Sequence, residues 1–151
     1  MDIGSGNGYP SSALSNFAPH RFEIDGVLCN SMEGFLQSLK FSNPAMQEHI
    51  CTLVGKKAKF AGKHKKWWRD QTLYWKGTSI KRDSAEYQQL LDRAYHELSK
   101  NPKFMNALTS TGNATLKHSM GRKKINETVL TQQEFCGRLT DIRASQRFFG
   151  A

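Results

Sequence analysis

Three polar side chains that could do chemistry recur along one predicted helix. Glu33, Gln37 and Lys40 are spaced four and then three residues apart. At about 100° per residue, the seven steps from Glu33 to Lys40 return the chain to within roughly 20° of its starting direction. Such a row is typical of a solvated helix face, where contacts of this kind contribute only about 0.2–0.5 kcal/mol each.

The same row acquires a different chemistry if it lines a pocket. Removal from water raises the pKa of a carboxyl group and lowers that of an amine, so both move toward the neutral forms that serve acid–base and nucleophilic catalysis. A neutral amine can attack an aldehyde carbon and form a Schiff base, and a ring-opened ribose offers such a carbon. Glu33 and Lys40 are therefore the candidate catalytic residues.

A short amphipathic helix over residues 32–41 must position this row. Ser31 is a favourable N-cap for it. Four apolar residues lie on the opposite side from the polar row and are expected in the core: Met32, Phe35, Leu36 and Leu39.

The rest of the chain is predicted to be mostly helical with a few short strands. Alternating apolar and polar residues around Asp25-Gly26 predict a hairpin over residues 21–30. Further expected elements are a helix opened by Asn43-Pro44 and ended by Gly55, a short helix and then a strand through 73–75, a helix opened by Asp83-x-x-Glu86, a short helix from Pro102 to near Gly112, and a helix behind the capping box Thr131-x-x-Glu134. We expect one predominantly helical α+β domain over residues 13–151, preceded by a flexible Gly- and Ser-rich segment over residues 1–12.

Composition fits a soluble protein of 151 residues, with 38% hydrophobic and 23% charged residues. No run of 18 apolar residues suggests a membrane span, and the first residues lack the basic start and apolar core of a secretory signal. The three cysteines are far apart and form no CxxC pair, which argues against a disulfide framework or a zinc site. We expect a cytoplasmic location, no membrane association, no metal and no cofactor.

Positive charge is concentrated in one stretch of the chain. The formal net charge is +9, and residues 55–82 contain ten lysines and arginines but a single acid. Five aromatic residues are interleaved with these charges: Phe60, Trp67, Trp68, Tyr74 and Trp75. This combination fits nucleic-acid binding without sequence readout, whereas a diphosphate would use only two or three cations. The alternative is a solubilising lysine surface, with two of the three tryptophans in the core.

Several separated motifs resemble the signature of the NADAR superfamily, also called YbiA-like proteins. The resemblance lies in Leu14-Ser15-Asn16-Phe17, the Asp25-Gly26 turn, Ser31-Met32-Glu33-Gly34-Phe35-Leu36-Gln37-Ser38-Leu39-Lys40-Phe41, Trp75-Lys76-Gly77, Ser84-Ala85-Glu86-Tyr87, Leu116-Lys117-His118-Ser119-Met120-Gly121, Asn126-Glu127-Thr128-Val129-Leu130-Thr131, Glu134-Phe135-Cys136 and Ile142-Arg143. Together they cover roughly residues 9 to 145, and their order makes the match far more specific than any single motif.

This resemblance implies a mostly helical α+β domain that handles ADP-ribose-like ligands and cleaves N-glycosidic bonds. Its known activities are removal of ADP-ribose from guanine bases in nucleic acid and hydrolysis of phosphorylated riboflavin-pathway intermediates. The catalytic glutamate and lysine of the family correspond to Glu33 and Lys40. We assign substrate binding to eight further residues: Asn16, Phe17, Gln37, Trp67, His118, Met120, Gly121 and Asn126.

The expected substrate is ADP-ribosylated DNA or RNA, with ADP-ribose as the product. Many family members have a Trp-Gly pair where this chain has Met120-Gly121, so the contact with the leaving base differs. Two alternatives stay open at this point. One is an N-glycosidase that acts on a small ribose-phosphate metabolite, and the other is a non-catalytic ADP-ribose or nucleic-acid binding module. His118 also fits a structural role.

Overall fold

The computed structural model describes the backbone of residues 1–149 and the side chains of residues 1–146. The elements in chain order are α1 (Ser11–Leu14), β1 (Phe22–Ile24), β2 (Val27–Cys29), α2 (Met32–Ser38), α3 (Pro44–Cys51), α4 (Gly55–Gly62), the 3₁₀ helix η1 (Trp67–Arg69), β3 (Thr72–Trp75), β4 (Thr78–Lys81), α5 (Ala85–Leu98), α6 (Pro102–Ser110) and α7 (Gln132–Phe149). The strands form two separate antiparallel hairpins, β1–β2 and β3–β4. The predicted α+β class with predominant helix is confirmed.

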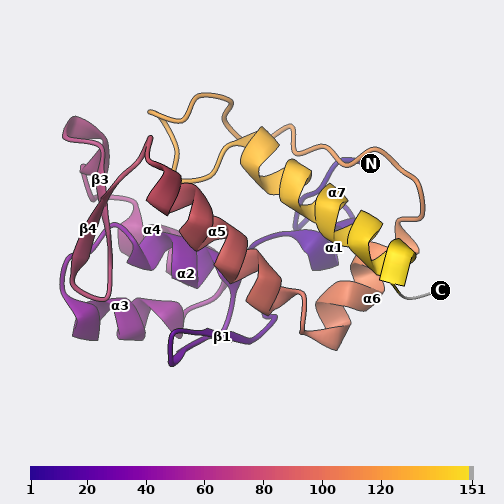
Figure 1. The fold of residues 1–151 in the computed structure, drawn as a ribbon, viewed down its shortest axis with the longest axis horizontal. Coiled ribbons are helices and arrows are strands. Elements are labelled where there is room, and N and C mark those ends of the chain that lie inside the picture. The colour runs from indigo at the N-terminus through magenta and orange to yellow at the C-terminus, as the bar shows by residue number, and fades with distance from the viewer. Residues whose placement is uncertain (150–151) are drawn as a thin grey trace.

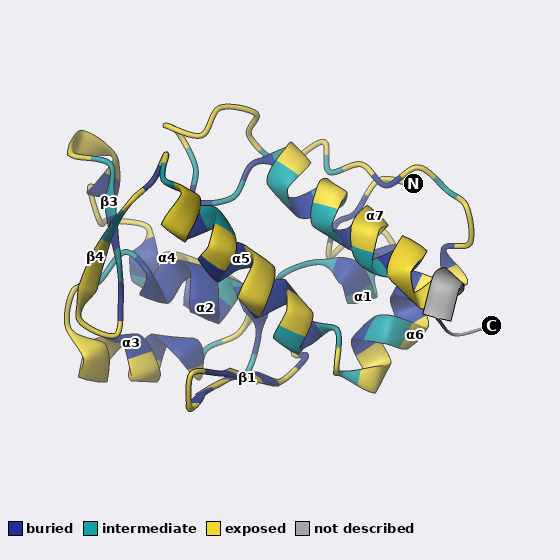
Figure 2. Cartoon of the chain, viewed as in Figure 1, coloured by how far each residue is buried: buried dark blue, intermediate teal, exposed yellow. Residues whose placement is uncertain are grey.

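Helix α2 packs against α3 and α4. Helix α5 crosses over it with α7 alongside, and α2 is almost entirely buried (Figures 1 and 2). Gly34 allows α2 to pack directly against the end of α3, because a Cβ there would lie 2.7 Å from the carbonyl oxygen of Leu53 and 2.9 Å from that of Ile50. The Ser31 hydroxyl accepts from Gly34 N at 3.0 Å and donates to Leu53 O at 2.9 Å.

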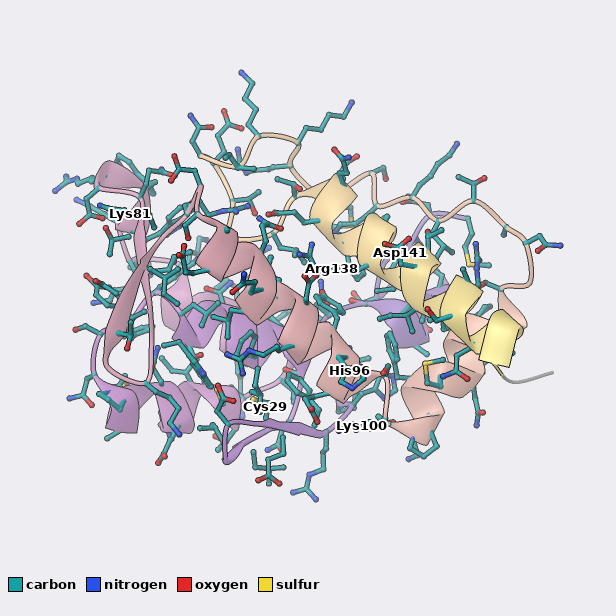
Figure 3. The ribbon with its side chains drawn as sticks, in the orientation of Figure 1. Cys29, Lys81, His96, Lys100, Arg138 and Asp141 are labelled. Atoms are coloured by element: carbon teal, nitrogen blue, oxygen red, sulfur yellow. The ribbon has the colours of Figure 1, made fainter. Side chains whose placement is uncertain are left out.

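Helices α5 and α7 are joined by side chains as well as by their apolar faces. Arg138 of α7 lies between the two helices (Figure 3) and forms a 3.0 Å ion pair with Asp92 of α5. Its guanidinium also donates to the carbonyl oxygen of Gln88 at 3.1 Å. The apolar stripe predicted for α5 is buried as expected: Tyr87, Leu90, Leu91, Ala94, Tyr95 and Leu98.

Capping residues and helical periodicity located most of the helices, but some of the predicted first and last residues were wrong. Asn43 caps α3 as predicted, but that helix ends at Cys51, and Gly55, predicted to end it, instead begins α4. The positive φ of 56° at Gly55 permits the sharp change of direction between the two helices. The cap of α5 is Ser84 rather than Asp83, since its hydroxyl accepts from Tyr87 N at 3.2 Å.

Part of the N-terminal segment expected to be flexible packs against the rest of the chain. Ile3 is completely buried, and its N–H donates to the carbonyl oxygen of Lys117 at 2.7 Å. The carboxylate of Asp2 accepts from Ser119 N at 2.8 Å. The segment therefore packs beside the chain that precedes α7 (Figure 1), and the buried side chain of Ile3 contributes to the core. Residues 150–151 of the predicted domain lie outside the described part.

The basic stretch contains α4, η1 and the hairpin β3–β4. The predicted strand through 73–75 lies within β3, and β4 follows it after the turn at Lys76-Gly77. Trp67 and Trp75 are buried whereas Trp68 is 53% exposed, which confirms that two of the three tryptophans belong to the core. In the part of the chain that the structure describes, no helix is long and apolar enough to span a membrane.

Candidate active site

A cavity of about 360 Å³ opens beside α2, between segments that are distant in the sequence. It is lined by residues of the N-terminal segment, the turn before β1, α2, α4, η1 and the loop that precedes α7. The predicted site residues along its wall are Asn16, Phe17, Glu33, Gln37, Lys40, Trp67, His118, Met120 and Gly121. The structure thus brings together nine of the ten residues that sequence analysis singled out.

Glu33, Gln37 and Lys40 face this cavity in one row. Gln37 donates its side-chain N–H to Oε1 of Glu33 at 3.0 Å. Lys40 lies just past the end of α2, and its Nζ donates to the carbonyl oxygen of Gly62 at 3.4 Å. Within the described residues, Glu33 and Lys40 make no ion pair with each other.

Burial shifts both groups toward their neutral forms. Desolvation raises the pKa of the Glu33 carboxyl, opposed by the hydrogen bond from Gln37 and by the charge of Lys40. Desolvation likewise lowers the pKa of the Lys40 amine, opposed by the charge of Glu33. A protonated carboxyl can act as a general acid, and an uncharged amine can act as a nucleophile. The row therefore has the electrostatics of a desolvated pair rather than of a solvated face.

Asn16 supports the row from the start of α2. Its backbone carbonyl accepts from Glu33 N at 2.9 Å, which satisfies a donor in the first turn of the helix. Its side-chain Oδ1 accepts from the buried hydroxyl of Tyr95 at 2.8 Å. This contact fixes the orientation of the amide, and among the described residues Asn16 Nδ2 makes no hydrogen bond. A ligand hydroxyl in the cavity could accept from it.

The loop with His118, Met120 and Gly121 forms another wall. His118 Nδ1 lies 2.8 Å from the carbonyl oxygen of Ile3, and since a carbonyl only accepts, Nδ1 carries the proton. In neutral His118, Nε2 is then an acceptor. Residue 121 must be small, because a Cβ there would lie 2.6 Å from His118 Cδ2. Met120 is 80% exposed and leaves its thioether free to pack on a ligand.

Asn126 is the predicted site residue that the structure places elsewhere. It is exposed and does not line the cavity. Its backbone carbonyl instead accepts from Gln71 Nε2 at 3.0 Å, while its neighbours Glu127 and Thr128 form part of the wall. Asn126 thus lies apart from the other nine candidates, and its backbone ties the loop to the residue before β3.

Sequence analysis missed two cations of the wall, Lys59 of α4 and Arg122 of the loop. Lys59 was one of ten similar charges in the basic stretch, and only its position on α4 distinguishes it. Arg122 directly follows Met120-Gly121, and this position next to two predicted site residues could have indicated that Arg122 lies in the wall. Among residues 1–149, no group of three or more His, Cys, Asp or Glu residues is placed to hold a metal ion.

A buried ion pair anchors the last part of the wall. Arg82 is completely buried and pairs with Glu134 at the start of α7. Arg82 Nε donates to the carbonyl oxygen of Thr128 at 2.8 Å, and the hydroxyl of Tyr87 donates to that of Val129 at 2.6 Å. Glu134 also closes the predicted capping box with Thr131, which is confirmed. The wall over residues 127–130 is thus fixed to α5 and α7.

Comparison with known proteins agrees with this architecture. The model of the family described as bacteriophage protein GP30.3 matches residues 8–144. The 17.1 kDa protein of the Gp30-rIII intergenic region of Enterobacteria phage T4 is 38% identical over 149 residues, which cover 96% of this chain and 97% of that protein. The NMR structure of the E. coli protein YbiA superposes with a TM-score of 0.64 at 15% identity, over 98% of this chain and 84% of that chain. The YbiA-like fold inferred from the motifs is confirmed.

Proposed function

This chain belongs to the bacteriophage GP30.3 protein family, and from its site we propose that it is an N-glycosidase that removes ADP-ribose from modified nucleobases in DNA or RNA, guanine above all. The observation that carries the proposal is the placement of Glu33 and Lys40 in one cavity, with both pKa values shifted toward the neutral forms. The motif resemblance and the YbiA-like fold support the same reaction class.

The reaction uses the two groups in sequence. Protonated Glu33 donates its proton to the ribose ring oxygen as the bond from that oxygen to C1 opens, and the electron pair of the base nitrogen stabilises C1. The neutral amine of Lys40 then adds to C1 and returns a proton to Glu33. Glu33 passes this proton to the base nitrogen as the bond between C1 and the base breaks, which leaves a Schiff base on Lys40.

Water completes the cycle. It adds to C1 of the Schiff base while Glu33 takes up a proton, and the bond between C1 and Nζ then breaks. The aldehyde of ADP-ribose is released and closes to the sugar ring, with the Lys40 amine and the Glu33 acid restored. The net reaction consumes one water and yields the free base and ADP-ribose.

The other lining residues suit the rest of such a substrate. Lys59 and Arg122 provide two positive charges for the diphosphate. Asn16 Nδ2 is directed to the ribose hydroxyls, while Gln37 holds Glu33 through its hydrogen bond. Phe17 and Met120 are apolar surfaces against which the leaving base can pack.

The test is incubation with an oligonucleotide that contains ADP-ribosylated guanosine, followed by chromatographic detection of free ADP-ribose. We expect release by the wild type, release by Lys57→Ala, and a loss of at least a hundredfold for Lys40→Ala. Borohydride added during turnover should reduce the Schiff base and leave a mass increase on the wild type that is missing in Lys40→Ala. Equal turnover by Lys40→Ala would overturn the mechanism, and intact substrate after hours with the wild type would overturn the function.

A further inference from the structure

An uncompensated positive surface lies next to the cavity. Residues 55–69, which form α4 and η1, contain seven lysines and arginines and no acid. In the described part of the chain none of these seven forms an ion pair with a carboxylate. By contrast, the last three cations of the basic stretch are held by the protein, since Arg82 pairs with Glu134 while Lys76 and Lys81 donate to backbone oxygens.

Two large aromatic side chains stand out on the same surface. Phe60 of α4 and Trp68 of η1 are each 53% exposed. Each has a cation over its ring, with Lys63 Nζ 5.3 Å from the centroid of Phe60 and the Arg69 guanidinium 5.8 Å from that of Trp68. Half-exposed aromatic rings, each with a cation over it, fit a partner that offers both flat rings and negative charges.

The two elements that carry these residues, α4 and η1, also contribute to the cavity wall. Lys59 and Trp67 line the cavity, and Phe60 and Trp68 are their immediate neighbours in the chain. Gln71 Nε2 donates to the carbonyl oxygens of Trp68 at 2.9 Å and of Asn126 at 3.0 Å. That bridge joins η1 to the loop over residues 121–128, so cations from two distant segments flank one opening.

The facing loop adds charge of the same sign. Arg122, Lys123 and Lys124 are consecutive and exposed. Arg122 alone has a nearby carboxylate, that of Glu127 at 3.9 Å. One ADP-ribose diphosphate occupies two or three cations at most, which leaves the charges beyond Lys59 and Arg122 without a role in the cavity.

We propose that Phe60, Lys63, Trp68, Arg69, Lys123 and Lys124 form a binding surface for an unpaired polynucleotide strand on either side of the modified nucleotide. Bases in a single strand expose their faces and stack on Phe60 and Trp68, while the cations neutralise adjacent phosphates. A duplex hides those faces, so the surface selects single strands. This inference rests on the proposed function in one respect: a polynucleotide substrate would place a strand beside the cavity.

The test measures binding of an unmodified, fluorescently labelled 15-nucleotide strand by anisotropy, with the same sequence as a duplex for comparison. We expect tighter binding of the single strand by the wild type. Phe60→Ala and Trp68→Ala should each weaken it about tenfold, since stacking contributes about 1–3 kcal/mol per base. Leu28→Ala removes an apolar side chain that is 49% exposed on the β1–β2 hairpin and is the matched control.

A second set of variants tests the charges. Lys63→Gln with Arg69→Gln should reduce the dependence of log K on log salt by about 0.7 for each phosphate that the protein no longer neutralises, whereas Lys100→Gln with Lys103→Gln should leave that slope unchanged. Circular dichroism checks that all variants fold. Equal affinity for duplex and single strand, no effect of the aromatic variants, or preferential binding to anionic phospholipid vesicles would overturn the proposal. Because the strand carries no ADP-ribose, this result is independent of whether the wild type releases ADP-ribose.

Discussion

The hydrogen bond of 3.0 Å from Gln37 Nε2 to Oε1 of Glu33 depends on the absence of a side chain at residue 62. A Cβ on Gly62 would lie 2.0 Å from Gln37 Oε1 and 3.2 Å from Gln37 Cβ. The end of α4 therefore sets the position of the candidate acid, although α4 contributes no atom to the hydrogen bond. The same Gly62 accepts from Lys40 through its carbonyl, so one residue positions both catalytic candidates.

Replacement of Gly62 by Ala should consequently impair catalysis. The new methyl group displaces Gln37, and Glu33 loses the donor that orients it. A misplacement of about 1 Å can reduce a rate about a hundredfold, and we expect ADP-ribose release to fall by about tenfold to a hundredfold. Gly137→Ala is the matched control, since a Cβ at Gly137 meets nothing within 4 Å. Full activity of Gly62→Ala would show that Gln37 does not position the acid.

The raised pKa of Glu33 predicts a pH-dependent gain in stability for Glu33→Gln. The folded protein binds the proton of Glu33 more tightly than the unfolded chain does, so this group lowers stability as pH rises through the interval above its ordinary pKa. The variant should be more stable than the wild type at neutral pH, by about 2–4 °C in Tm for about 1 kcal/mol. The difference should vanish below about pH 4, where the carboxyl is protonated in both states.

Thermal unfolding between pH 3.5 and 8 measures this difference, with Glu23→Gln on the exposed face of β1 as the control. A wild type more stable than Glu33→Gln at neutral pH would contradict the assignment of Glu33 as a desolvated acid. Activity should be lost in Glu33→Gln whatever the stability, because the amide cannot deliver a proton.

Tyr95 acts on the site through Asn16. Tyr95→Phe removes the hydroxyl that donates to Asn16 Oδ1 at 2.8 Å and leaves the amide free to rotate. We expect a loss of about 1 kcal/mol in stability and a rise in KM of about fivefold with a smaller change in kcat, because in the proposed function Asn16 binds the sugar and transfers no proton. Tyr74→Phe on β3 is the control. A selective loss of kcat would indicate that Tyr95 acts on Glu33 instead.

The sequence predicted those features that depend on neighbours close in the chain. Ser31, Asn43 and Thr131 cap helices through contacts within three residues, and the stripe on α5 follows from helical periodicity. Glu33 and Gln37 share one direction for the same reason. The helix expected over residues 32–41 ends at Ser38, and Lys40 follows in a turn where its N–H donates to the carbonyl oxygen of Gln37 at 3.2 Å. These features do not depend on how the chain is folded back on itself.

Features that depend on contacts between distant segments were not predictable in this way. The N–H of Ile3 donates to the carbonyl oxygen of Lys117, and no local pattern indicates that pairing. Lys59 lines the cavity because α4 packs on α2, whereas the neighbouring Lys57 looks equivalent in the sequence. Asn126 belongs to a conspicuous motif, yet Gln71 holds its backbone outside the cavity.

The buried pair of Arg82 and Glu134 should control both stability and the cavity wall. Burial alone would raise the pKa of the Glu134 carboxyl. Hydrogen bonds from Arg82 and Gln88 nevertheless hold this pKa below its ordinary value. The ionised form therefore stabilises the fold above the ordinary pKa, and this contribution is lost as pH falls below it. Arg82→Met leaves the buried carboxylate of Glu134 without its ion-pair partner and should reduce the free energy of unfolding by about 3–5 kcal/mol.

Urea unfolding of Arg82→Met, Glu134→Met and the double variant separates the pair from its surroundings. The double variant should recover part of the loss, because it no longer buries an unpaired charge. Hydrogen exchange should nevertheless rise over residues 127–130 in every variant without Arg82, since the carbonyl of Thr128 loses its donor. If exchange there stayed as slow as in the wild type, Tyr87 through its bond to Val129 would be sufficient to hold the wall, and Arg82 would serve stability alone.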